Sequence, residues 1–370
     1  MLEKTNLKNN FFSVLLGTSV AKIFGFFREF LFLIYLGNST TYSEILSLLV
    51  ISTLVMFLSD SAFLNPIIYP QWERTGKQMI KLNAYHLLLF IVLSIIFYIF
   101  NEISLQLNQP FYVKIICSFL WIPLLFHGFG YSFLLYTKKL KTYNFLINII
   151  AITYLIGFWF LKDFGSEAYI ISRFVSIVIG VLIVLFLMGK SIKISFKFTN
   201  LNREQIFDST LKFLSVNNFI LSIFIIRLII SQFFQSELAV INYTLVIIFI
   251  FYSLINKNLN ALTILENAEG KLKGRLLQKK YFLFFLVGLI LTTIFINSLS
   301  VVYFKTISQE LILNILYYSL FLLPTLMLCG NIDLKNSEVI LNHKIHYNWR
   351  NFTYIILSVG TFFGLFSLLH

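Results

Sequence analysis

The sequence has very few cysteines, and neither is placed to form a disulfide or to hold a metal. Its two cysteines, Cys117 and Cys329, both fall within long apolar runs. Disulfide frameworks and Cys/His metal sites need several such residues at short, regular spacings. We therefore expect no disulfide framework, no metal site and no cofactor in this chain.

Charged residues are also scarce. Asp, Glu, Lys and Arg make up 12% of the 370 residues, whereas 58% are hydrophobic, including 43 phenylalanines. Soluble globular domains carry about twice that share of charge, roughly 25%. The mean hydropathy of +0.84 points the same way. This composition excludes an ordinary soluble domain and predicts an all-α, polytopic membrane protein.

Signatures of enzymes are missing from the sequence. It contains no HExxH, no phosphate-binding glycine loop and no GxSxG. The predicted outer loops are short and hold no pair of aspartates that could bind a catalytic metal. A membrane glycosyltransferase or polymerase is thus the least favoured class, and we expect no catalytic residues.

Eleven windows of about 20 apolar residues predict membrane-spanning helices. The first is too long and too charged for a signal-peptide core, so we expect it to be a retained span. The short Gln235-Ser236-Glu237 segment is expected to be a turn between two spans. The spans run near 11–36, 45–70, 83–101, 111–137, 143–161, 168–189, 211–235, 238–262, 281–304, 310–331 and 351–369.

The lysines and arginines between the spans fix an orientation. With the N-terminus in the cytoplasm, nearly all of them fall in inner segments, and Lys114, Lys162 and Lys305 are the exceptions. Cytoplasmic loops of membrane proteins are enriched in this way. The net charge of +13 is therefore explained by membrane topology, and we expect no nucleic-acid partner.

A basic cytoplasmic linker divides the chain. Residues 190–210 separate an N-terminal bundle of six spans (1–189) from a C-terminal bundle of about five (211–370). Lys190, Lys193 and Lys197 alternate with apolar residues, and we expect an amphipathic segment against anionic lipid headgroups, not a sheet element. Two bundles with a central cavity between them are a recurrent transporter plan.

The first span carries charges where lipid is expected. At 100° per residue, Lys22, Gly25, Arg28 and Glu29 fall within an arc of about 120°. A charge at mid-membrane costs several kcal/mol, so this face must line a polar cavity or meet partner helices. The alternative is a structural ion pair between Arg28 and Glu29, with Arg28 reaching the outer headgroups.

Other polar residues within spans are candidates for the same cavity. Arg227 follows an asparagine pair in the seventh span, and Asp60 in the second could be the counter-ion of Lys22 or a proton-coupling carboxylate. Arg173 is expected in a salt bridge with Asp163 or Glu167 at the outer surface, and His127 as a buried histidine. The remaining cavity candidates are Asn65, Asn217, Asn218 and Asn242.

Two short patterns carry a family resemblance. Residues 21–29, AKIFGFFRE, and the following Tyr35-Leu36-Gly37 resemble the S-R-x-x-G-x-x-R-[DE]…F-G opening of the MviN-type lipid II flippases. Arg227 and the segment AVINY at 239–243 resemble the D-R and A-L-N-Y elements of that family. These flippases belong to the multidrug/oligosaccharidyl-lipid/polysaccharide exporter superfamily.

The resemblance implies two helical lobes around a cationic cavity in the bacterial cytoplasmic membrane. The implied cargo is a polyprenyl-diphosphate-linked glycan, and Lys22, Arg28 and Arg227 match cavity arginines of the family. Met56 and Val246 fall where the family has further arginines, and Ser43 where it has aspartate. Residues 58–63, LSDSAF, resemble polysaccharide-unit exporters equally well, so the cargo stays open between lipid II and an exopolysaccharide or O-antigen unit.

We therefore expect a flippase for a lipid-linked glycan, working among membrane lipids with a coupling cation or the membrane potential as a possible driving force. The rival within the same fold is a cation-coupled multidrug antiporter. That chemistry needs carboxylates in the membrane, and the spans offer Glu29 and Asp60 against four cations, Lys22, Arg28, Arg173 and Arg227. The balance favours an anionic cargo.

Overall fold

A computed structural model gives the structure of the chain. It describes residues 7–50, 80–83, 109–136, 139–188, 192–195, 218–252 and 310–319, with single helical positions elsewhere. Asp60, Asn65 and Asn217 lie outside the described residues, as do most of the predicted spans 45–70, 83–101 and 281–304 and most of the linker 190–210.

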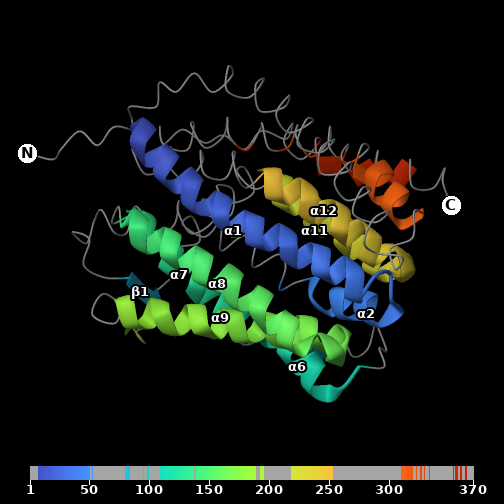
Figure 1. Ribbon diagram of the computed structural model, residues 1–370, viewed down its shortest axis with the longest axis horizontal. Helices are drawn as coiled ribbons and strands as arrows, with labels where there is room; N and C mark the ends of the chain where they lie inside the picture. Colours follow the sequence, from blue (N-terminus) through green and yellow to red (C-terminus); the bar gives the residue numbers. More distant parts are fainter. Residues whose placement is uncertain are drawn as a thin grey trace, which may run out of the picture.

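Long helices dominate the described part of the chain (Figure 1). Three segments, Phe111–Gly128, Leu140–Phe164 and Ser166–Leu187, are long and apolar enough to cross a membrane. The elements are α1 (Leu7–Tyr35), α2 (Thr40–Leu48), β1 (Ile80–Asn83), α6 (Phe111–Phe119), α7 (Trp121–Tyr136), α8 (Leu140–Leu161), η1 (Lys162–Phe164), α9 (Ser166–Met188), β2 (Ile192–Ser195), α11 (Asn218–Phe233), η2 (Gln235–Glu237) and α12 (Leu238–Tyr252). The predicted turn at 235–237 is thus present as η2.

The linker contains a strand that the sequence analysis did not expect. Strands β1 and β2 pair in parallel, with Ile80 opposite Ile192 and Asn83 opposite Ser195. The expectation of no sheet element was therefore wrong for 192–195, where the period-two alternation does form a strand. The pairing brings residues 80–83 and 192–195 side by side.

Helix α1 packs closely along α8 (Figure 1). We use N-terminal bundle as a name for the described helices α1, α2 and α6 to α9, and C-terminal bundle as a name for α11 and α12. The Asn144 side chain donates to the backbone carbonyl of Ser13 (3.0 Å), and the Asn148 side chain donates to that of Gly17 (3.1 Å). A Cβ atom on Gly17 would lie 2.0 Å from Asn144 Cγ. Glycine therefore lets the two helices approach and exposes a carbonyl to the facing helix, as in many membrane bundles.

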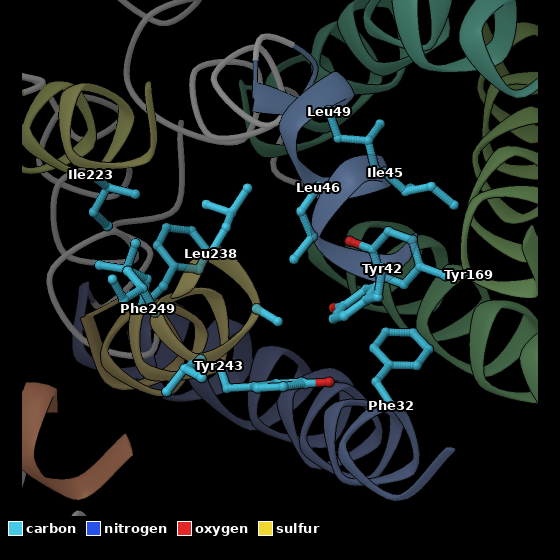
Figure 2. Packing of buried hydrophobic residues seen from close by; sticks show 14 of the residues in the cluster. Phe32, Tyr42, Ile45, Leu46, Leu49, Tyr169, Ile223, Leu238, Tyr243 and Phe249 are labelled. Atoms are coloured by element: carbon cyan, nitrogen blue, oxygen red, sulfur yellow. The ribbon is translucent and has the colours of Figure 1, made fainter. Parts of the chain in front are cut away.

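An aromatic cluster fills one end of this bundle. The ring of Phe32 lies 4.5 Å from that of Phe158 and 4.9 Å from that of Tyr169, in edge-to-face geometry. The ring of Tyr42 on α2 lies 5.2 Å from that of Tyr169 on α9. Figure 2 shows Phe32, Tyr42 and Tyr169 gathered where α1, α2 and α9 meet. Such rings fix the helix ends through both burial and contact geometry.

Helices α11 and α12 lie on the other side of α1 from α8 and meet it at the same end (Figure 1). Helix α2 contacts α11, η2 and α12, and α12 contacts α1. Gly37, with φ of +55°, ends α1 in the left-handed region, and its carbonyl accepts from the Tyr243 hydroxyl (3.0 Å). We call this end, with Gly37, η1 and η2, the closed end, because the two bundles touch here.

The surface of the closed end suits a membrane interface. Trp159, Phe160 and Phe164 are exposed there. The Lys162 ammonium lies 4.1 Å from the centre of the Trp159 ring and donates to the Tyr35 hydroxyl (3.3 Å). Aromatic residues with adjacent lysines are typical of the level of the lipid headgroups.

Candidate functional site

A cavity of about 210 Å³ lies between the two groups of helices. Residues of α1, α7, α8, α9, α11 and α12 line it, and both bundles contribute. Its basic and acidic lining residues are Lys22, Arg28, Glu29, His127, Arg173 and Arg227. Among the described residues, the lining thus carries four lysine and arginine side chains against one carboxylate.

The charged face predicted for the first span lines this cavity. Lys22, Gly25, Arg28 and Glu29 all belong to the lining. A Cβ atom on Gly25 would meet nothing within 4 Å, so this glycine borders open space. The Lys22 ammonium lies 5.0 Å from the centre of the Phe249 ring on α12, a cation–π contact that crosses from one bundle to the other.

Arg28 and Glu29 form an ion pair inside the cavity. Arg28 Nη2 and Nε lie 2.5 Å and 3.1 Å from Glu29 Oε1. The Arg28 guanidinium also lies 4.4 Å from the centre of the Tyr154 ring. The ion pair and the cavity, offered above as alternatives, are therefore both present, and Glu29 offsets part of the charge of α1.

Arg227 reaches the cavity from α11 and is only 6% exposed. Its Nη2 donates to Asn242 Oδ1 (2.6 Å), and Asn242 Nδ2 donates to the hydroxyl of Tyr42 (3.3 Å). Asn242 also belongs to the cavity lining. The contacts run from α11 through α12 to α2 and so join the bundles at the closed end.

The position of Arg173 corrects a sequence prediction. It was expected at the outer surface with Asp163 or Glu167, but it is 5% exposed and lines the cavity. Its Nη1 donates to the Tyr169 hydroxyl (3.2 Å) one turn earlier. Tyr169, Arg173 and Ser176 recur at helical spacing and all line the cavity. This polar stripe was a signal that could have identified the residue.

The α7 wall of the cavity holds a buried histidine. His127 is 6% exposed, and its ring lies 4.1 Å from that of Tyr131, edge to face. The interior position agrees with the sequence interpretation of a buried histidine. Both rings add polar atoms to a wall that is otherwise apolar.

Asn218 is not one of the residues that line the cavity. It begins α11, where the carboxylate of Asp333 accepts from the backbone N–H groups of Asn218 (2.7 Å) and Phe219 (2.9 Å) and from Asn218 Nδ2 (2.8 Å). Asp333 is fully buried. A carboxylate at this place satisfies the exposed N–H groups of a helix N-terminus. Asp333 therefore caps α11 by accepting from Asn218 and Phe219, and Asn218 lies outside the cavity lining where it was expected.

The chain is similar in fold to known structures, but it matches no known sequence family. No family model matches the chain, and no curated protein does. One solved structure, the outward-facing conformation of a multidrug resistance MATE family transporter of the MOP superfamily, matches with a TM-score of 0.55 at 12% identity. The match covers 95% of this chain and 84% of that one. The chain has the fold of this transporter.

This match confirms the predicted all-α, polytopic membrane fold. A crystal structure of a mutant MATE protein is also similar, with a TM-score of 0.49 and 13% identity over 96% of this chain and 92% of the other. MviN-type flippases belong to the same superfamily, and the likeness to them in particular stays a prediction. The roles of Lys22, Arg28 and Arg227 as substrate ligands also stay predictions.

The arrangement of basic side chains suits the binding of anions. Guanidinium and ammonium groups in a cavity of low polarity attract oxyanions, and arginine can contact two phosphate oxygens at once. Among the described residues, no three His, Cys, Asp or Glu side chains gather where they could hold a metal ion. The cavity is a pocket lined by charged side chains between the two bundles.

Proposed function

We propose that this protein is a membrane transporter that carries a polyprenyl-diphosphate-linked glycan across the bacterial cytoplasmic membrane. The observation that supports it is the lining of the cavity by Lys22, Arg28, Arg173 and Arg227 with one carboxylate, Glu29. Several buried cations within a membrane cost free energy that an anionic cargo offsets. A diphosphate supplies both the charge and the oxygens that arginine contacts bidentately.

The distribution of lysines supports an orientation in the membrane. If the N-terminus is cytoplasmic, α1 ends at the outer side, and the closed end with Gly37, η1 and η2 faces outward. The cavity in this structure is then closed toward the outside. Transport would require the bundles to separate at this end and to meet at the other.

A flipping assay tests the proposal. The purified protein is reconstituted in vesicles with a fluorescent glycan on a short polyprenyl diphosphate, and its transfer between leaflets is timed. Arg28→Gln and Arg227→Gln should each slow transfer at least about tenfold, because each removes a charge-assisted contact. Lys162→Gln, at the closed-end surface, should leave the rate unchanged. Unchanged rates in both arginine variants would contradict the proposal.

A cation-coupled multidrug antiporter is the second candidate. It is supported by the fold shared with a multidrug transporter and by Glu29, a carboxylate within the cavity. Expression in a drug-sensitive bacterial strain tests it. Resistance to cationic drugs that is lost in Glu29→Gln, together with no flipping of the glycan, would favour this candidate over the first.

A further inference from the structure

The strand pair of β1 and β2 lies at the end of the N-terminal bundle away from the closed end. Helix α9 begins at Ser166, next to η1, and ends at Met188, and β2 follows soon after at Ile192. Figure 1 shows β1 at the left, at the end of the helices remote from α2. The pair joins the segment between the second and third predicted spans to the linker that follows α9. Under the proposed orientation, this end of the bundle is cytoplasmic.

The register gives the strand pair two faces of different character. Strand β1 reads Ile-Lys-Leu-Asn and β2 reads Ile-Lys-Ile-Ser, and the two pair residue for residue. Successive residues of a strand alternate between its faces. The four aliphatic positions therefore share one face, and the two lysine positions, Lys81 and Lys193, share the other. Two strands alone are only marginally stable in water, so this pair needs support from its surroundings.

The two lysines occupy opposite positions in the register. Neighbouring strands lie about 4.8 Å apart, so two charges of the same sign at opposite positions weaken the pairing. Membrane topology explains lysines in cytoplasmic segments, but it does not require two of them to face each other across a strand pair. An anion held by both lysines turns this repulsion into a contribution to the pairing.

The sequence around the strands supplies no negative charge. No Asp or Glu occurs between Glu73 and Glu102, or between Glu167 and Glu204. The connection from α7 to α8 lies at the same end of the bundle, because α8 runs from Leu140 to the closed end, and residues 137–141 read TKKLK. The charge at this end therefore favours an anionic partner.

We propose that β1 and β2 form a binding site for the headgroup of an anionic phospholipid, with Lys81 and Lys193 as its ligands. An amphipathic segment at a membrane surface places its apolar face at the boundary of headgroups and acyl chains and its lysines among the headgroups. Lysine clusters beside the cytoplasmic end of a membrane helix attract anionic lipids in the same way. The bound lipid stabilises the pairing and so fastens the linker to the N-terminal bundle.

Binding of short-chain phosphatidylglycerol to the purified full-length protein in detergent, measured by native mass spectrometry, tests the site. Lys81→Gln and Lys193→Gln should each raise the dissociation constant for phosphatidylglycerol about fivefold, the effect of one lysine at an anionic membrane surface. Binding of phosphatidylcholine, which has no net charge, should be the same in both variants as in the wild type.

An exchange of two neighbouring residues is the sharpest control. Lys193→Ile combined with Ile194→Lys keeps the charge and the composition of β2 but moves the lysine to the other face of the strand pair. It should weaken phosphatidylglycerol binding as much as Lys193→Gln does. Lys141→Gln is the matched control, because Lys141 is exposed at the same end of the bundle but lies outside the strand pair. It should leave phosphatidylglycerol binding unchanged.

Several outcomes would overturn the inference. Wild-type phosphatidylglycerol affinity in the folded exchange variant, or an equal loss in Lys141→Gln, would indicate attraction by net charge without a site. Displacement of phosphatidylglycerol by inorganic phosphate would indicate a site for free phosphate. Binding of polyglutamate that depends on both lysines, without binding of phosphatidylglycerol, would indicate an acidic protein partner.

Melting temperature and size-exclusion profile show whether each variant is folded. Lys193→Gln keeps the test valid if the exchange variant is not. None of these measurements involves transport, so the headgroup site stands or falls independently of the cargo of the cavity.

Discussion

Helix α1 makes two contacts of different character. Toward α8, within its own bundle, asparagine side chains bond to backbone carbonyls across a glycine that permits close approach. Toward α12, in the other bundle, it meets a cavity, and the junction with α2 depends on side chains such as Asn242 and Tyr243. Under the proposed function, the difference indicates which contact stays during transport. Close packing of two helices along their length resists change, whereas the few contacts at one end of a cavity can be exchanged.

Gly17→Leu should have the largest effect on this comparison. Even the Cβ atom would lie 2.0 Å from Asn144 Cγ, so the Asn144 side chain must move and lose its bond to Ser13, and the rest of the leucine must fit between α1 and α8. We expect a loss of about 3 kcal/mol or more in stability, the upper range for overpacking. Thermal unfolding in detergent measures it. Gly25→Ala, whose Cβ enters open space, is the control, and equal melting temperatures for both variants would show that α1 is not held by α8.

Replacing Asn144 or Asn148 by leucine should have a smaller effect on the same contact. Each change removes a bond to a carbonyl of α1, and bonds between membrane helices contribute about 1 kcal/mol. The same unfolding measurement applies. Phe145→Leu, on the exposed side of α8, should change nothing measurable. A loss at Phe145 as large as at the asparagines would contradict the assignment.

Tyr42→Phe and Tyr243→Phe should loosen the closed end without unfolding the protein. Each removes one bond that joins α12 to α2 or to the end of α1. At about 1 kcal/mol per bond, the open population should rise roughly fivefold. Spin labels at the exposed Asn38 and Ser236, with both cysteines replaced by alanine, report the distance across the bundles.

The control for that experiment lies within one bundle. Labels at Asn38 and Asp163, both in the N-terminal bundle at the closed end, should keep their distance in the same variants. A change in this distance would mean that the tyrosine variants distort the bundle itself. An unchanged distance between Asn38 and Ser236 would mean that the two hydrogen bonds do not hold the closed end together.

Lys162→Gln should have the smallest effect. Its contacts with Trp159 and Tyr35 lie at the surface, where such interactions contribute about 0.5 kcal/mol or less. The melting temperature should move by no more than a degree or two for a protein of this size. A larger shift would show that the surface of the closed end contributes to stability as the buried contacts of α1 do.

Apolar runs and the spacing of polar residues along the sequence predicted much of the fold and one wall of the cavity. The helical spacing of Lys22, Gly25, Arg28 and Glu29 predicted the face of α1 that lines the cavity. The polar residues at 235–237 predicted the turn that the structure shows as η2. The helical class followed from composition because long apolar runs in lipid must satisfy their backbone internally.

Long-range contacts could not be predicted in this way. Arg173 was assigned to the surface because its distance along the chain from Asp163 and Glu167 was known, whereas the rotation of α9 was not. The bonds of Asp333 to Asn218 and Phe219 join residues more than a hundred positions apart, and the pairing of β1 with β2 is equally remote in sequence. Such contacts depend on how helices are arranged, which no local spacing encodes.

The bond from Arg227 to Asn242 has a consequence for the permeability of the membrane. The same guanidinium lines the cavity and supports the closed end. Under the proposed function, a cargo that draws Arg227 toward itself weakens a bond that keeps the bundles together. An empty cavity would then stay sealed, so that protons and ions do not leak through the protein between transport cycles.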